Sequence, residues 1–268
     1  MDKPRIRCEI RDGIAEVMLT RGDKLNALDR AMFGAIDETL NQLARQKGLR
    51  AVILHGEGRA FCAGLDVKSM LRQPVAALEI LRREADEATN LAQRVAYGWH
   101  QLPVPVIAVT QGVCFGGGLQ IALGADFRFS TPDCRFSVME IKWGIIPDMS
   151  GSATLRNLMG VDVAMELAMS GRELDAQEAR ALGLVSRVCE DPLDAAREFA
   201  RTLITKSPDA LAGIKQLYHQ AWARSDEVML KEETRLQQQI LGRPNQWRAT
   251  LNSLFRWRLP FGPRRNAL

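Results

Sequence analysis

The stretch VTQGVCFGGGLQIAL, residues 109–123, decides the fold of this chain. A β-branched apolar run, residues 104–110, is broken by Gly112, and a short apolar helix pattern follows the triplet 116–118. The pattern predicts a strand, a tight turn and a helix N-terminus, where the backbone must come close to another group. Free N–H groups at such an end suit an anion or a developing oxyanion. The plainer alternative is a turn that needs glycine for steric reasons alone.

The length and composition indicate a folded globular protein. The chain has 268 residues, of which 46% are hydrophobic and 25% charged, and a formal net charge of +4. This length fits one large domain, or one domain with a small appendage, and can bury a substantial core. Much of the basic excess lies at the C-terminus, in Arg256, Arg258, Arg264 and Arg265. A modest local excess favours an anionic ligand over a nucleic-acid surface.

The cysteines and the N-terminus predict the compartment. The five cysteines are scattered, odd in number and without paired spacing. This usage indicates a reduced, cytoplasmic protein with neither a disulfide framework nor a metal site. The N-terminus has no apolar signal core, and no apolar run reaches 18 residues. We therefore expect neither secretion nor a membrane partner.

The first half of the chain predicts alternating strands and helices. Residues 6–19 read as a β-hairpin with Asp12-Gly13 in the turn, and Asp29 is placed to cap a helix. Residues 51–55 form a continuously apolar strand, as expected when both faces are covered. Residues 73–100 contain a further helix pattern in which Ala88 would share a face with Trp99. The order strand, helix, strand predicts an α/β architecture.

A second glycine-bearing loop follows the strand at 51–55. Residues 56–67 read GEGRAFCAGLDV, and the backbone N–H near Leu65 is a second candidate for presentation in a turn. The structural alternative is that Gly64 is a simple turn residue and Asp66 a helix cap.

Several motifs, each weak alone, occur in the order and spacing of one family. The chain resembles the crotonase (enoyl-CoA hydratase/isomerase) superfamily from its first hairpin to about residue 190. The motifs that carry the resemblance are LNAL at 25–28, AFCAGLD at 60–66, PVIAV at 105–109, GGG at 116–118, GAD at 124–126, Met139-Glu140 and GLV at 183–185.

The resemblance implies a fold, a substrate and an oxyanion hole. The expected fold is the ClpP/crotonase-like ββα superhelix with a helical C-terminal segment, divided into a core at 1–200 and a helical part at 201–268. The expected substrate is a coenzyme A thioester, with no other cofactor. In this family two backbone N–H groups hold the thioester oxygen, and the matching positions here are Leu65 and Gly117.

The side-chain chemistry departs from that of the hydratases. The hydratases resemble one another in carrying two glutamates that hold a water molecule and transfer protons. The second matches Glu140 here, whereas the position of the first is occupied by Gln120. A glutamine can orient a water molecule but cannot accept a proton at neutral pH. Asp148 matches a position at which dienoyl-CoA isomerases carry an aspartate, so the chain resembles those enzymes there. Asp148 could equally cap the following helix or pair with Lys142.

The resemblance also implies positions that contact coenzyme A and an oligomer. The candidate coenzyme A contacts are Lys24, Leu25, Ala63, Asp66, Phe255 and Arg258. The last two match a C-terminal aromatic and a basic residue near the nucleotide end of the substrate. In the family pattern the C-terminal helices cover the active site or a neighbouring subunit, so we expect a homotrimer or homohexamer.

Three functions follow from these residues. With Glu140 and Asp148 as acids, double-bond isomerisation of an enoyl-CoA is chemically the easiest assignment, and hydration is close behind. The alternative is a non-catalytic acyl-CoA-binding homologue, because the first hydratase glutamate is Gln120. A dinucleotide-binding enzyme is disfavoured because residues 112–118 lack the Gly-x-Gly-x-x-Gly register.

Overall fold

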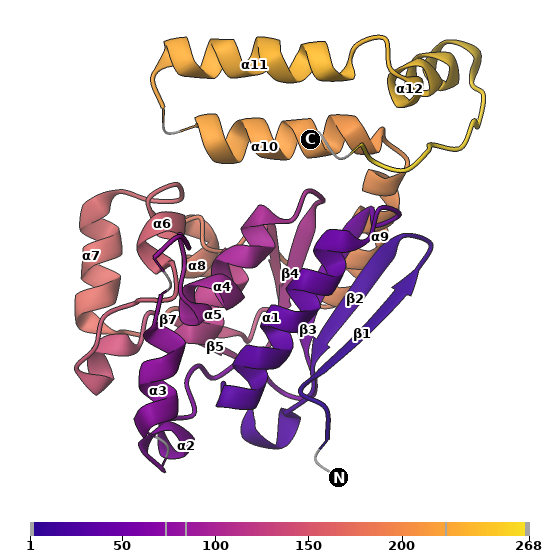
Figure 1. Cartoon of the computed structure of the whole chain (residues 1–268). Coiled ribbons are helices and arrows are strands. Elements are labelled where there is room, and N and C mark those ends of the chain that lie inside the picture. Colours follow the sequence, from indigo (N-terminus) through magenta and orange to yellow (C-terminus); the bar gives the residue numbers. More distant parts are fainter. Residues whose placement is uncertain (1–2, 73, 84, 223, 266–268) are drawn as a thin grey trace.

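A six-stranded sheet forms the centre of the computed structural model, which describes residues 3–265 except 73, 84 and 223 (Figure 1). The strand order is β1-β2-β3-β4-β6-β8. Only β1 and β2 pair antiparallel, and the other neighbours in this sheet are parallel. Its strands are β1 (Ile6–Arg11), β2 (Ile14–Leu19), β3 (Ala51–Gly56), β4 (Val106–Thr110), β6 (Phe127–Ser130) and β8 (Arg187–Val188).

A small second sheet and the helices complete the chain. The second sheet pairs β5 (Val113–Phe115) with β7 (Arg135–Ser137) in parallel. The α-helices are α1 (Arg30–Arg45), α2 (Val67–Arg72), α3 (Pro74–Leu81), α4 (Leu91–Gln101), α5 (Gly117–Leu123), α6 (Gly151–Leu155), α7 (Val161–Ser170), α8 (Ala176–Ala181), α9 (Pro192–Ile204), α10 (Pro208–Ala221), α11 (Asp226–Ile240) and α12 (Pro244–Phe255). Two short 3-10 helices are η1 (Gly22–Lys24) and η2 (Glu140–Trp143).

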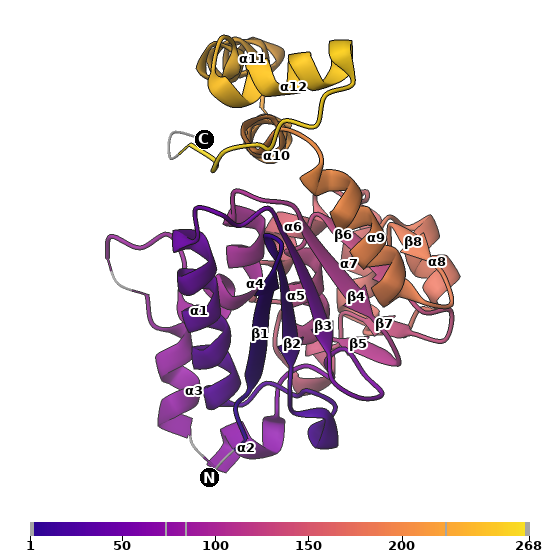
Figure 2. The same ribbon diagram turned by 90° about the vertical axis from the view of Figure 1, so that its right-hand side faces the viewer.

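The two faces of the large sheet are covered by different helices. Helices α1, α4 and α5 pack against one another on one face, and α9 packs on β3, β4 and β6 from the other side (Figure 2). Both faces of β3 and β4 are therefore buried, which confirms the continuously apolar strand predicted at 51–55. The predicted hairpin is confirmed as well, with Asp12 and Gly13 at positive φ in its turn.

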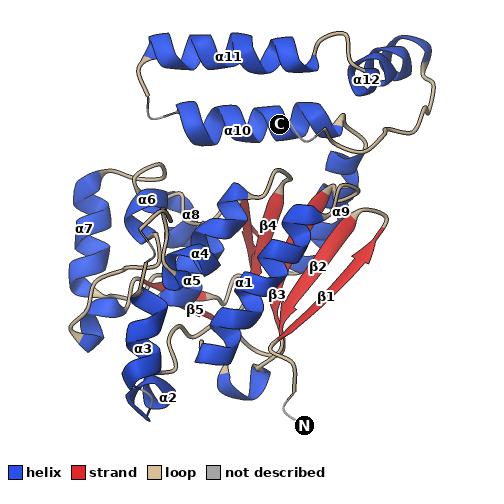
Figure 3. Ribbon diagram, in the orientation of Figure 1, coloured by secondary structure: helices blue, strands red, loops and turns tan. Residues whose placement is uncertain are grey.

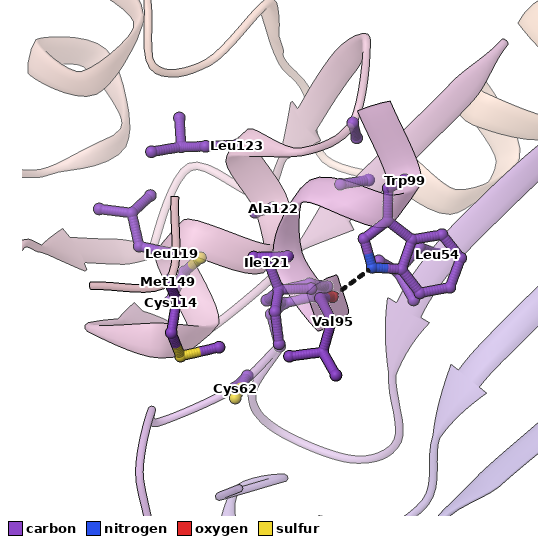
Figure 4. Packing of buried hydrophobic residues seen from close by; sticks show 14 of the residues in the cluster. Leu54, Cys62, Val95, Trp99, Cys114, Leu119, Ile121, Ala122, Leu123 and Met149 are labelled. Carbon is purple, nitrogen blue, oxygen red and sulfur yellow. Dashed lines mark hydrogen bonds between the residues drawn. The ribbon is translucent and has the colours of Figure 1, made fainter. Parts of the chain in front are cut away.

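Apolar side chains from the sheet, α4 and α5 form the main core (Figure 4). Every residue of α5 is buried. Trp99, fully buried, satisfies its indole N–H by donating to the carbonyl of Val95 at 2.9 Å. The core therefore holds α5 rigidly, and with it the glycine turn at its N-terminus.

Capping side chains set where helices α1 and α4 begin. The Asp29 side chain accepts the Met32 N–H at 2.8 Å, which confirms the predicted N-cap of α1. The helix pattern predicted within 73–100 is two helices, α3 and α4, and Ala88 lies in neither. Asn90 and Gln93 form a capping box that begins α4 at Leu91, so the placement of Ala88 on the Trp99 face was wrong.

The last three helices form a separate layer above the sheet (Figure 3). Helix α9 continues on the sheet to Ile204, and α10 begins at Pro208 and packs against α11 and α12. Lys215 of α10 reaches the core, where its ammonium donates to the carbonyls of Trp99 and Val104. Among the described residues, no helix is both long enough and apolar enough to cross a membrane.

Candidate active site

Three loops meet at the carboxyl ends of the parallel strands. The segment after β2 runs beside the segment after β3, because the Leu28 N–H donates to Gly64 O at 2.8 Å and the Ala63 N–H to Leu25 O at 2.9 Å. Leu28 and Leu65 pair as an isolated parallel bridge. In α/β sheets, ligands bind at this end of the strands.

Glycine is required where these loops touch the turn before α5. A Cβ on Gly64, which has φ +87°, would lie 2.8 Å from Phe115 O and 3.5 Å from Gly117 N. A Cβ on Gly117 would lie 2.7 Å from Met149 Sδ. The two glycine loops predicted from the sequence are therefore in direct contact, and the steric need for glycine at both positions is confirmed.

The backbone N–H groups of Leu65 and Gly117 are both available. Within the part of the chain that the structure describes, neither donates a hydrogen bond to a protein acceptor. The neighbouring Gly116 N–H, by contrast, donates to Ser137 O at 2.9 Å. The two adjoining loops therefore each carry a backbone donor without a protein acceptor in the described part of the chain.

Cys62 lies in the same loop cluster. Its thiol donates to Asn26 O at 3.1 Å, and its Sγ would be 2.8 Å from a Cβ on Gly118. Complete burial raises the pKa of this thiol to about 12, so Cys62 is protonated at neutral pH.

Glu140 begins η2 and is 6% exposed. Its Oε1 accepts from Gln120 Nε2 at 2.6 Å, and its buried Oε2 has no hydrogen-bond partner among the described residues. Burial raises the pKa of this carboxyl, and repulsion from Asp148 raises it further. The carboxylate faces the glycine turn, since Oε1 lies 3.4 Å from the position of a Cβ on Gly116.

Gln120 is 2% exposed and uses both ends of its amide. Its Oε1 accepts the Met149 N–H at 2.9 Å and the Gly151 N–H at 2.8 Å, while its Nε2 donates to Glu140. These partners fix the orientation of the amide. Gln120 therefore holds Glu140 and the 149–151 turn against α5, and its carbonyl oxygen is already saturated.

Asp148 is half-buried beside this turn. Burial raises the pKa of its carboxyl, and its charge acts on Glu140. The suggested role as a helix cap was wrong, because Ser150 precedes the first residue of α6. Among the described residues it forms no ion pair with Lys142 or any other cation. Asp148 is thus a second acid near Glu140 without a counter-ion.

The candidate coenzyme A contacts near the N-terminus gather around the same loops. Lys24 is exposed, and Leu25 is joined to Ala63 by the backbone hydrogen bond described above. The Asp66 carboxylate is occupied within the protein: it forms an ion pair with Arg21 at 2.7 Å and accepts the Ser69 N–H at 3.0 Å. The structure therefore confirms the alternative interpretation of Asp66, that it caps the following helix.

The two C-terminal candidates lie elsewhere. Phe255 ends α12 and Arg258 follows it, and both are exposed. Figure 1 places α12 at the end of the molecule opposite α2 and the loop cluster. Within one chain, the structure does not bring Phe255 and Arg258 to Glu140.

Sequence reasoning missed Arg21 and Met149. Arg21 donates to Ala27 O at 2.8 Å as well as to Asp66, and it supports the Leu25–Leu28 loop. Met149 packs over Gly117. Arg21 could have been found from the sequence, because it starts the loop that ends in the capping residue Asp29. Met149 could not, because its position depends on the hydrogen bonds of Gln120, which no local pattern reveals.

The sequence profile of the family described as enoyl-CoA hydratase/isomerase matches residues 9–247. The chain belongs to this family. The 1,2-epoxyphenylacetyl-CoA isomerase of Escherichia coli K12 is 31% identical over 258 residues, covering 95% of this chain and 97% of the relative. "Probable enoyl-CoA hydratase EchA17" of Mycobacterium tuberculosis H37Rv is 35% identical over 205 residues, 76% of each chain.

Solved structures agree with this assignment to the enoyl-CoA hydratase/isomerase family. An enoyl-CoA hydratase from Polaromonas sp. JS666 superposes with a TM-score of 0.85 at 27% identity, covering 96% of this chain and 99% of the other. One from Bacillus anthracis superposes with a TM-score of 0.86 at 25% identity, covering 96% and 98%. The predicted crotonase fold is confirmed, and the chain is an enzyme of the hydratase/isomerase type.

Proposed function

We propose that this family member moves the double bond of an enoyl-CoA by proton transfer through Glu140, while Leu65 and Gly117 hold the thioester oxygen. The observation that carries the proposal is the saturated amide of Gln120. Hydration in the pattern of the hydratases requires a second carboxylate to share a water molecule with Glu140. The carbonyl oxygen of Gln120 is committed to Met149 and Gly151, so Glu140 and Asp148 are the acids that remain.

The two unpaired N–H groups support the first step. Removing a proton next to a thioester or a conjugated double bond leaves an enolate whose charge collects on the thioester oxygen. The N–H groups of Leu65 and Gly117 lie on adjoining loops and have no protein acceptor among the described residues. A donor of this kind commonly contributes roughly 3 to 4 kcal/mol to transition-state stabilisation.

The free oxygen of Glu140 supports the second role. Oε2 takes the proton from the substrate carbon as the electron pair moves toward the thioester oxygen, and the carboxylic acid then returns a proton to the other end of the conjugated system. Burial raises the pKa of Glu140, which brings a carboxylate closer to the range in which it exchanges protons efficiently near neutral pH. Asp148 is close enough to influence that charge and is the candidate for relaying the proton.

Hydration is the second candidate. It is favoured by the names of relatives and structural neighbours, several of which are enoyl-CoA hydratases. Here Glu140 alone would activate the water. The alternative from the sequence, a non-catalytic acyl-CoA-binding homologue, runs against the family membership and enters the test as the outcome without proton exchange.

One experiment separates the three. The protein is incubated with crotonyl-CoA and with a 3-enoyl-CoA in deuterated water, and products and α-deuterium are followed by mass spectrometry. Double-bond migration without hydration supports the proposal, and addition of water to crotonyl-CoA replaces it with hydration. Acyl-CoA binding without deuterium uptake favours the non-catalytic homologue. Glu140→Gln should abolish migration, whereas the exposed Glu198→Gln is the matched control.

We also propose assembly into a homotrimer or homohexamer, with the helices after residue 200 resting on a neighbouring chain. Two groups of exposed apolar side chains support this, one around η2 and α7 and one on α10–α12. They are Ile141, Trp143, Ile145, Ile146, Val161, Met165 and Met169, and Ile214, Tyr218, Trp222, Val228, Leu230, Trp247, Leu254 and Phe255. Light scattering after gel filtration measures the mass; a monomer contradicts the proposal.

A further inference from the structure

A cavity of about 920 Å³ lies at the amino ends of the strands, opposite the loop cluster that holds Glu140. It opens between the C-terminal end of α4, the residues after α6, and α10. Its lining includes Tyr97, His100, Arg156, Lys215, His219 and Arg224. Its volume falls in the range of pockets that enclose small organic ligands.

The lining is cationic, and two of its arginines have no partner among the described residues. No Asp or Glu is among the described residues that line this cavity. Arg156 and Arg224 are exposed, and neither guanidinium has a hydrogen-bond or ion-pair partner in the described part of the chain. Planar guanidinium groups bind phosphate oxygens in a bidentate manner.

A second cavity, on the outer face of β1 and β2, differs from the first in the charges that line it. It measures about 680 Å³ and is lined by Arg7, Arg11, Arg197 and Arg201, but also by Glu9, Asp12 and Glu16. Arg197 pairs with Glu16 at 2.8 Å, and Arg11 with Glu9 at 2.6 Å. Arginines alone therefore do not distinguish an anion site; the absence of acids among the described lining residues does.

The floor of the cationic cavity is rigid. Lys215 lies 2.8 Å from Asp126 Oδ2, and its ammonium also donates to two core carbonyls. Asp126 accepts the Val106 N–H at 2.7 Å, at the start of β4. The charge of Lys215 is thus balanced by Asp126, and the excess positive charge of the cavity belongs to the arginines.

Aromatic rings form one wall. His100 stacks on His219 with ring centroids 3.6 Å apart, and on Tyr97 at 4.8 Å. Burial, with repulsion from His219 and Lys215, lowers the pKa of His100 to about 3, so this ring is neutral at pH 7. Both faces of His100 are therefore covered by the two neighbouring rings, and the aromatic surface left for a nucleobase is that of Tyr97, which lines the cavity.

We propose that this cavity binds a nucleotide, with its phosphates on Arg156 and Arg224 and its base against the Tyr97 ring. The shared chemistry is a base joined to a diphosphate. Both a free nucleoside diphosphate and the nucleotide end of coenzyme A carry it. The site is distinct from the Glu140 site, which lies at the other end of the sheet.

The test is calorimetric titration of the full chain with ADP as the probe. We expect binding that weakens roughly tenfold or more in the double variant Arg156→Ala/Arg224→Ala, because each charged contact to phosphate is lost. The matched control is Arg7→Ala/Arg201→Ala in the second cavity, whose arginines share the lining with Glu9, Asp12 and Glu16; it should bind ADP as the wild type does. No binding of ADP, or an equal loss in both double variants, overturns the proposal.

Further measurements distinguish the cationic cavity from the Glu140 site, and coenzyme A from a free nucleotide. Adenosine should bind much more weakly than ADP; equal affinity would remove the phosphate from the argument and overturn the proposal. Loss of ADP binding in Lys24→Ala, with retention in Arg156→Ala/Arg224→Ala, would assign ADP to the Glu140 site and overturn the proposal. The stoichiometry of coenzyme A binding identifies the source of the nucleotide. Two molecules bound per chain, falling to one in Arg156→Ala/Arg224→Ala, identify coenzyme A as the occupant of the cavity. One molecule per wild-type chain identifies a free nucleotide.

Discussion

Each end of the parallel sheet buries a carboxylate, but the two carboxylates have opposite surroundings. At the amino end, Asp126 forms an ion pair with Lys215 and lies 2.9 Å from His219 Nε2, and these contacts outweigh its burial and lower its pKa. At the carboxyl end, Glu140 accepts from the neutral amide of Gln120, forms no ion pair among the described residues, and has its pKa raised by burial. The first carboxylate is tied to a buried cation, and the second, to which we assign the proton transfer, has no cation beside it among the described residues.

The comparison teaches which property distinguishes the two roles. Burial is common to both, so burial alone does not mark a catalytic acid. The difference is the counter-ion: a buried acid without one is costly to the fold and is retained where its proton is needed. Four substitutions test this contrast.

Glu140→Gln has the largest expected effect. Replacing the base with an isosteric amide should lower kcat/KM by about 10²- to 10⁴-fold, in the range of general acid–base catalysis. Turnover of a 3-enoyl-CoA and loss of α-deuterium uptake provide the measurement. Unchanged turnover would remove Glu140 from the mechanism.

Asp126→Asn should affect stability rather than chemistry. It leaves the Lys215 ammonium buried without its partner, which commonly costs about 3 to 5 kcal/mol. The pKa of Asp126 is lowered in the folded state, so its contribution is present above the unfolded pKa and is lost as the pH falls through the folded one. Urea unfolding should therefore show a gap between wild type and variant that narrows in acid; a gap independent of pH would contradict the ion pair.

Gln120→Glu sharpens the comparison at the carboxyl end. The variant replaces a donor to Glu140 with a like charge, which should raise the pKa of Glu140 further. We expect the acid limb of the kcat/KM profile to move to higher pH and turnover at neutral pH to fall roughly tenfold. Gln46→Glu, on an exposed residue, is the control. An unmoved limb would mean that Gln120 does not position Glu140.

Leu65→Ala should have the smallest effect. The proposed donor is the main-chain N–H, so truncating the side chain should change kcat/KM by less than about tenfold, well below the loss expected for removal of a donor. Steady-state kinetics measure this. A loss comparable to that of Glu140→Gln would show that the leucine side chain, and not its N–H, is what the reaction uses.

The sequence predicted the features that depend on neighbouring residues. The Asp12-Gly13 hairpin turn, the Asp29 cap and the buried strand at 51–55 follow from local patterns, and all are present. The contact between the two glycine loops, at Gly64 and Gly117, was anticipated through family resemblance, since each loop alone had a plain structural explanation.

What could not be predicted depends on distant contacts. Gln120 reaches Met149 and Gly151 across about thirty residues of sequence, so its role as a positioning group is visible only after folding. The same holds for Asp148, which local spacing suggested as a helix cap. The cationic cavity likewise joins Tyr97, Arg156 and Arg224 from three separate segments.

The buried thiol of Cys62 has a consequence for the enzyme's self-protection. An α,β-unsaturated thioester is an electrophile that alkylates thiolates by conjugate addition. Cys62 lies in the loop that presents Leu65, yet its pKa of about 12 and its hydrogen bond to Asn26 keep it protonated and covered. In the proposed reaction, Cys62 would therefore stay beside an electrophilic substrate without being alkylated by it.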